Sequence, residues 1–300
     1  MPFPVFQILA GRLSYAPSEP ANNVAAPRAA DPAAVRKLFT LVNALLSKLC
    51  ESRFVPSVLF KVFSRILPVA TATVRGVQIK AVLPLNEAGV FSQFRRWETR
   101  DPEVLDWLDS LEPDTVLFDV GASFGNEALY AALKKGGPRR IVCFDLDLRS
   151  TFYLAYNLHI NHITKVDPYH AAISSKSGFI RHEQPTNYAC VAGQPKYDRV
   201  SHRTWSLALD DFIEMTKESP DYLKVDVDGS EDQVIEGMKE TLRGKTLKSL
   251  LIEVCEQTRG PVVDALEQAG FKILRASKFS GGSDGTATSN IIFVRDAPPR

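Results

Sequence analysis

The chain has 300 residues, of which 45% are hydrophobic and 24% charged, a composition typical of globular proteins. The net charge of +1 gives no electrostatic case for a nucleic-acid partner, so we expect none. The four cysteines form neither a CxxC pair nor a Cys/His cluster, which argues against a structural zinc site. Unpaired cysteines fit a reducing compartment, and we expect the protein in the cytoplasm.

The N-terminal part is basic and is predicted to lie outside the main domain. Residues 1–32 are rich in Pro, Ala and Asn toward their end, and we interpret them as a flexible tail or linker. Residues 33–84 form a predicted extension of two amphipathic helices and a hairpin that turns at Arg75. The helices either cap the rest of the protein or make weak peripheral contact with an anionic membrane through residues 33–67.

From residue 85 onward, strand and helix patterns alternate. A helix is predicted to begin at Asp101, and helical runs separate the first six of seven predicted strands. The strands are Val116–Val120, Arg140–Phe144, Val166–Ala171, Tyr222–Val227, Ser249–Val254, Phe271–Ala276 and Asn290–Arg295. This alternation predicts an α/β domain over residues 85–300, with a mostly parallel sheet and helices on both faces. The last two strands lack a helix between them, so we expect an antiparallel hairpin there.

The stretch FDVGASFGN forms a glycine-containing corner between the first strand and the next helix. Glycines permit a ligand to approach the backbone, although a merely tight turn is the plainer alternative. The dinucleotide fingerprint G-x-G-x-x-G is absent, because Ser123 stands where its second glycine should be. The corner instead suits S-adenosyl-L-methionine, whose tail ammonium Asp119 would attract. Gly121 and Gly125 would make room, and amides near Asn126 would receive the tail carboxylate.

Two residues outside the corner are further candidates for cofactor contact. A second acid at the end of the next strand should accept hydrogen bonds from the ribose hydroxyls, and Asp145 in IVCFD lies at that position. Trp97 precedes the first strand and is a candidate to cover the cofactor.

Four stretches together resemble the FkbM-type methyltransferases, namely FDVGASFGN, FDLD, NLHIN and YLKVDVDGSEDQVIEGM. The resemblance implies a class I, Rossmann-like fold with a seven-stranded sheet and S-adenosyl-L-methionine as the cofactor. It also implies a hydroxyl acceptor on a sugar, a lipid-linked glycan or a secondary metabolite, and it points to the backbone of Ala171 beside adenine. The chain departs from the family at Asp145, which is more often Glu, and at Glu127, which is usually an apolar or neutral residue.

The stretch KVDVDGSE forms a second group of charged residues. Lys224, Asp226 and Asp228 alternate and would share one face of a regular strand, while Glu231 opens the following helix. We predict Asp226 as the general base, with Lys224 and Glu231 as its catalytic neighbours. A salt-bridged strand end is the plainer alternative. Three carboxylates could also hold a divalent cation, but Lys224 already offers a counter-charge and we predict no metal.

These observations favour a methyltransferase that acts on a hydroxyl of a small molecule, sugar or glycan. An NAD-dependent oxidoreductase and a non-catalytic binding module on the same scaffold remain the alternatives. The predicted cofactor-binding residues are Asp119, Gly121, Ser123, Gly125, Asn126, Asp145, Ala171 and Asp226. The sequence gives no oligomeric state.

Overall fold

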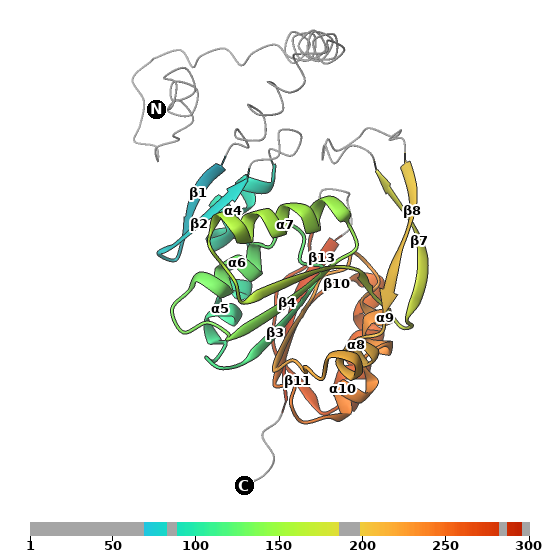
Figure 1. Ribbon diagram of the computed structural model, residues 1–300. Coiled ribbons are helices and arrows are strands. Elements are labelled where there is room, and N and C mark those ends of the chain that lie inside the picture. Colours follow the sequence, from blue (N-terminus) through green and yellow to red (C-terminus); the bar gives the residue numbers. More distant parts are fainter. Residues whose placement is uncertain (1–68, 83–88, 186–198, 282–286, 296–300) are drawn as a thin grey trace, which may run out of the picture. The chain divides into compact units, whose positions relative to one another are not determined.

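The computed structural model describes residues 69–82, 89–185, 199–281 and 287–295 (Figure 1). The chain divides into two compact units, Met1–Arg65 and Ile66–Arg300, and the described residues all belong to the second. The predicted tail over 1–32 and the predicted helices over 33–67 lie outside the described residues. No helix in the described ranges is long and apolar enough to cross a membrane.

A seven-stranded sheet forms the centre of the second unit, in the order β11-β13-β10-β9-β3-β4-β5. Its strands are β3 (Val116–Val120), β4 (Arg140–Asp145), β5 (Val166–His170), β9 (Tyr222–Val225), β10 (Ser249–Cys255), β11 (Phe271–Ala276) and β13 (Ala287–Arg295). The five strands from β10 to β5 are parallel to one another. Strand β13 runs antiparallel to both β10 and β11, and the short β12 (Ser280–Gly281) pairs with it. The mostly parallel sheet and the antiparallel C-terminal pair are therefore confirmed.

Helices cover both faces of this sheet, as the alternation predicted. They are α4 (Gly89–Arg100), α5 (Pro102–Ser110), α6 (Asn126–Leu133), α7 (Leu148–Ile160), α8 (Leu209–Thr216), α9 (Glu231–Glu236), α10 (Lys239–Arg243) and α11 (Glu256–Gln268). Alternate residues of a strand point to opposite faces, so β3 feeds two separate cores. Leu117 packs with α4 to α7 on one face, whereas Phe118 packs with α8 to α11 on the other. Figure 1 shows α5 and α6 on one side of the sheet and α8 and α10 on the other.

The predicted hairpin is present as β1 (Val69–Val74) and β2 (Val77–Val82), joined at Arg75 and Gly76. It lies in the same compact unit as the sheet and packs against α4, α6 and α7. Trp97 of α4 is only 2% exposed and packs edge-on against Phe94 and Tyr130. The expectation that Trp97 covers the cofactor is therefore wrong, because its ring is part of the core.

A small sheet between β5 and β9 is the main element that the sequence did not predict. It contains β6 (Ala172–Ile173), β7 (Gly178–Pro185) and β8 (Arg199–Leu207), in the order β6-β8-β7. The stretch was expected to be helical, but among its described residues, 171–185 and 199–221, α8 is the only helix. Phe179 and Trp205 pair across β7 and β8, and both side chains are exposed. These two strands are not the continuous apolar runs that identified the buried strands of the central sheet.

The NLHIN stretch has a structural role at the edge of the hairpin. Asn161 accepts a hydrogen bond from the Lys80 N–H at 3.0 Å and donates to the Lys80 carbonyl at 2.6 Å. One helical turn earlier, Asn157 accepts from the Val82 N–H at 2.9 Å and donates to the Phe124 carbonyl at 3.1 Å. Asn157 is 1% exposed, so a buried amide links the hairpin to the glycine corner.

Replacement of this amide should loosen both connections. We expect Asn157→Ala to lower the free energy of unfolding by about 1–3 kcal/mol, because the Val82 N–H and the Phe124 carbonyl lose their buried partner. The exposed His159→Ala on the same helix is the control and should stay within about 0.5 kcal/mol of the parent protein. Denaturant unfolding of both variants measures the difference, and equal losses would contradict the structural role of Asn157.

Candidate active site

Two rows of side chains cross the parallel strands near their carboxyl ends. In the first row, Asp119 of β3 lies in register with Cys143 of β4 and Lys224 of β9, and Lys224 lies in register with Leu251 of β10. The second row comes two residues later along each chain segment, at the last residue of β4, just past the ends of β3 and β9, and within β10. We call it the edge row, and its members are Asp145, Gly121, Asp226 and Glu253. The register thus places three carboxylates and one glycine along a single edge.

Lys224 is the charged centre of this region. Its side chain is 4% exposed, and its Nζ lies 3.3 Å from Asp119 Oδ1, 3.4 Å from Asp226 Oδ2 and 3.9 Å from Glu127 Oε2. The same Nζ donates to the Gly121 carbonyl at 3.3 Å. Asp119 is fully buried, and neither of its carboxylate oxygens receives a hydrogen bond in the described part of the chain. One ammonium therefore faces three carboxylates in a site that largely excludes water.

Burial and charge act against each other in this cluster. Burial alone would lower the pKa of Lys224, but Asp119, Glu127 and Asp226 hold it well above its ordinary value. Burial raises the pKa of Asp119 despite the attraction of Lys224. Burial likewise raises the pKa of Glu127 to about 7, with Asp119 and Asp226 adding to the increase. Glu127, the departure from the family pattern, therefore points toward Lys224 and lies close to its titration point at neutral pH.

The glycine corner depends on a close approach between two loops. Gly121 has a φ of 78°, and a Cβ atom there would lie 1.6 Å from the Asp226 carbonyl oxygen. The Asp226 N–H in turn donates to the Val120 carbonyl at 2.9 Å. Gly125, at the N-cap of α6, has a φ of 88° and packs against Leu154. Only glycine at 121 allows the chain after β3 to touch the chain after β9.

Asp145 braces the corner from the neighbouring strand. Its carboxylate accepts from the Ser123 N–H at 2.6 Å and from the Asp147 N–H at 2.7 Å. Burial raises the pKa of Asp145 to about 6, although these two hydrogen bonds oppose the shift. Ala171, which is 5% exposed, donates its N–H to the Asp145 carbonyl at 3.0 Å. The structure thus brings Asp145, Ser123 and Ala171 together. Asn126 lies apart from these contacts as the first residue of α6.

The structure separates Asp228 and Glu231 from the Lys224 cluster. Strand β9 ends at Val225, and Asp228 has a φ of 53°. The expectation that Asp228 shares a strand face with Asp226 is therefore wrong. Glu231 is 2% exposed and accepts from the Gly229 N–H at 2.8 Å and from the Thr258 hydroxyl at 2.7 Å. Both oxygens of Glu231 thus fix the loop that follows Asp226, which is a holding role.

Glu253 is a residue of the edge row that the sequence analysis missed. Burial, and then the charge of Asp226, raise the pKa of Glu253 to about 8. Its Oε1 accepts a hydrogen bond from the Thr288 hydroxyl at 2.6 Å. The sequence did contain a signal for Glu253, because it is the one charged residue in the otherwise largely apolar strand SLLIEVC. No group of three His, Cys, Asp or Glu residues in the described ranges is arranged to hold a metal ion. The divalent-cation alternative therefore has no ligand set there.

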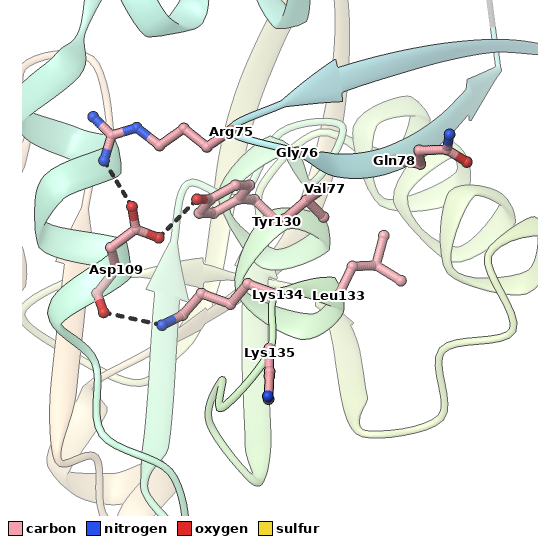
Figure 2. Close-up of a pocket in the computed structure, with 9 residues that line it drawn as sticks. All are labelled: Arg75, Gly76, Val77, Gln78, Asp109, Tyr130, Leu133, Lys134 and Lys135. Carbon is pink, nitrogen blue, oxygen red and sulfur yellow. Dashed lines mark hydrogen bonds and ion pairs between the residues drawn. The ribbon is translucent and has the colours of Figure 1, made fainter.

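A cavity of about 670 Å³ lies away from the strand ends, between the hairpin turn and α6 (Figure 2). Arg75, Asp109 and Lys134 in its lining are already in contact with one another. Asp109 accepts from Arg75 Nη1 at 2.7 Å and from the Tyr130 hydroxyl at 2.7 Å. Lys134 Nζ donates to the Asp109 carbonyl at 3.2 Å. These contacts hold the hairpin turn against α5 and α6, and we assign no chemistry to this cavity.

The loop contact at Gly121 can be tested against a second glycine of similar conformation. Gly76 has a φ of 81°, but a Cβ atom there would meet nothing within 4 Å. Both Gly→Ala variants carry the cost of a left-handed residue, about 1–2 kcal/mol. Gly121→Ala should lose about 1–3 kcal/mol more of the free energy of unfolding, because the Asp226 backbone must move. Equal losses in denaturant unfolding would mean that the two loops separate freely.

Comparison with known proteins identifies the family. The Methyltransferase FkbM domain matches residues 119–273, just over half of the chain. No curated protein matches the sequence significantly.

Solved structures are similar only at low identity. An rRNA methylase from Streptococcus thermophilus is 11% identical, with 65% of this chain and 94% of that chain covered and a TM-score of 0.42. A precorrin-6y C5,15-methyltransferase from Geobacter metallireducens is 15% identical, with coverages of 66% and 89% and a TM-score of 0.42. An FkbM methyltransferase from Methylobacillus flagellatus is 14% identical, with coverages of 70% and 56% and a TM-score of 0.42. On the strength of the domain match, the chain belongs to the FkbM methyltransferase family, and its cofactor is S-adenosyl-L-methionine.

Proposed function

We propose that this methyltransferase acts on a hydroxyl oxygen of a small molecule, a sugar or a glycan. The observation that carries the proposal is the position of Asp226. Its side chain is 32% exposed, it belongs to the edge row, and its Oδ2 lies 3.4 Å from Lys224 Nζ. Asp226 is thus a partly open carboxylate directly beside the groups that suit the cofactor.

The residues of the corner fit S-adenosyl-L-methionine. Asp119 is a buried carboxylate without a hydrogen-bond donor in the described residues, and the ammonium of the cofactor's amino acid tail would supply one. Asp145 would accept from the ribose hydroxyls. The amides at the start of α6, near Asn126, would receive the tail carboxylate. The positive charges of the cofactor would also offset the excess of carboxylates around Lys224.

Gly121, Ser123, Gly125 and Ala171 complete the proposed cofactor site through their backbone. Gly121 and Gly125 leave open the space that a side chain would fill. Ser123 is exposed on the corner while its N–H is held by Asp145, and Ala171 would lie beside the adenine ring. The same arrangement speaks against the NAD alternative, because the dinucleotide spacing is absent and the Ser123 N–H is already bonded.

Asp226 is proposed as the general base, with the other charged residues in supporting roles. The bound cofactor supplies an electrophilic methyl group on a sulfonium. The protein then has to orient an acceptor oxygen and remove its proton. Lys224 is unsuited to be the base, since its pKa is held well above its ordinary value. It holds and orients Asp226, and Glu231 fixes the loop behind it.

The charge of the site favours a neutral acceptor. Asp119, Glu127 and Asp226 lie within 4 Å of one lysine, so a phosphorylated or polyanionic acceptor would be repelled. This supports a hydroxyl acceptor on an uncharged molecule and a function without nucleic acid. The buried free thiols of Cys143 and Cys255 support our proposal that the enzyme acts in the cytoplasm.

Two assays test the proposal in sequence. Calorimetric titration of the full chain with S-adenosyl-L-methionine and with NAD should give binding for the first ligand only. Methyl-labelled S-adenosyl-L-methionine should then transfer label to at least one member of a panel of hydroxylated sugars and glycans. Binding without transfer to any acceptor, amines included, would favour the non-catalytic alternative. Transfer to an amine only would contradict O-methylation.

Asp145 and Asp226 should separate binding from transfer. We expect Asp145→Ala to weaken cofactor binding by about 1.5–3 kcal/mol, because the ribose hydroxyls lose a charged acceptor. We expect Asp226→Asn to lower transfer to the acceptor found in the panel by roughly 10²–10⁴-fold with little change in cofactor affinity. Each variant is the control for the other. If Asp145→Ala binds the cofactor with a dissociation constant within twofold of the parent value, Asp145 is not the ribose acceptor. If Asp226→Asn loses binding and transfer equally, Asp226 is not the general base.

A further inference from the structure

Asp226 and Glu253 lie next to each other across two parallel strands. Val225, the last residue of β9, pairs with Ile252 of β10, so Asp226 and Glu253 are the next residues of neighbouring chain segments. Lys224 Nζ lies 3.4 Å from Asp226 Oδ2, which places the Asp226 side chain on the face of Lys224. Glu253 is on that face too, because Leu251, two residues before it, is in register with Lys224. Two neighbouring carboxylates repel each other, and a proton on one of them replaces that repulsion with a hydrogen bond. A hydrogen bond between two carboxyl groups requires a proton on one of them, because two carboxylates are both acceptors.

The surroundings determine which of the two carries this proton. The Asp226 carboxyl group lies 3.4 Å from the ammonium of Lys224, a partner of opposite charge. Glu253 has the hydroxyl of Thr288 on β13 at 2.6 Å, a neutral partner that fixes the carboxyl group in place. Glu253 is therefore the member that keeps the proton, and Asp226 is the member that accepts the hydrogen bond.

We propose that Asp226 and Glu253 form a dyad with one shared proton, in which Glu253 is the positioning residue that orients the Asp226 carboxylate. This inference rests on the proposed function of Asp226 for its catalytic meaning. With Glu253 bonded to one side of the Asp226 carboxylate, a lone pair remains for the acceptor hydroxyl. As the O–H proton passes to Asp226, the oxygen bonds to the methyl carbon. The S–C bond breaks with its electron pair on sulfur, which leaves S-adenosylhomocysteine.

The remaining charges around the dyad support a single shared proton. Asp119 and Glu127 share Lys224 with Asp226, and the charge of Asp101, between α4 and α5, repels that of Asp226. Ionisation of Glu253 would place another negative charge among them. Burial first, and then the charge of Asp226 and the hydrogen bond with it, raise the pKa of Glu253 to about 8.

The raised pKa gives the dyad a signature in stability. Between the ordinary glutamate pKa, about 4.3, and about 8, the folded protein holds a proton on Glu253 that the unfolded chain has lost. The stability that this proton contributes is fully present below the lower value and is lost as pH rises through the upper one. Glu253→Gln keeps an N–H donor but cannot ionise, so the parent protein should lose stability relative to this variant from pH 5 to pH 8.

Carboxyl-labelled glutamate NMR of the full chain tests the dyad without acceptor or cofactor. We expect one glutamate resonance that titrates near pH 8 and disappears in Glu253→Gln. In Asp226→Asn the same resonance should shift its midpoint downward by about 1 pH unit or more, because the neighbouring charge is gone. The exposed Glu256→Gln is the control and should leave this resonance unchanged.

Two results would overturn the inference. One is a Glu253 resonance with an ordinary glutamate midpoint, and the other is a raised midpoint that Asp226→Asn does not move. Denaturant unfolding of the parent protein and of Glu253→Gln at pH 5 and pH 8 gives a second, independent readout. Either of these results would reject the dyad without bearing on cofactor binding or methyl transfer. The proposed function is rejected only by the binding and transfer assays.

Discussion

The buried ammonium of Lys224 is the interaction on which the site depends. It sits within 4 Å of three carboxylates, so it makes the burial of Asp119 tolerable and holds Asp226 at the edge. One positive charge against three acids still leaves the cluster short of cations. S-adenosyl-L-methionine brings a sulfonium and an ammonium, which are the charges that such a cluster lacks. The electrostatics of the apoprotein thus complement the cofactor of its family.

Geometry supplies the second constraint, through the contact between the chain after β3 and the chain after β9. Gly121 lets the Asp226 backbone come close, and the Asp226 N–H is bonded to Val120. The proposed base is therefore fixed to the corner at which we propose that the cofactor binds. Glu231 holds the following loop from behind, and Asp145 braces the corner from β4. A proton-accepting carboxylate positioned in this way needs little motion to meet an acceptor oxygen.

Much of the fold could be predicted from the sequence, because its buried strands are continuous apolar runs. Strand β3 matches the predicted Val116–Val120 at both ends, and Asp119 and Asp145 follow from the position of strand ends. The β7–β8 pair was missed because its exposed face carries no buried-strand pattern. Glu253 was missed since its proximity to Asp226 depends on the pairing of β9 with β10, and sequence spacing does not contain that register. The hydrogen bond between Thr258 and Glu231 could not be predicted, because Thr258 lies far along the chain.

The central claim is that the Lys224 cluster is poised for a cationic cofactor, and proton release on binding tests it most directly. At pH 7, Glu127, with a pKa of about 7, is about half protonated. The arriving positive charges should lower its pKa. Calorimetry of S-adenosyl-L-methionine binding in buffers of different ionisation enthalpy should therefore show release of up to about half a proton. The release should be smaller with S-adenosylhomocysteine, which lacks the sulfonium, and should vanish in Glu127→Gln. Binding at pH 7 with no proton release, or with proton uptake, would contradict the account.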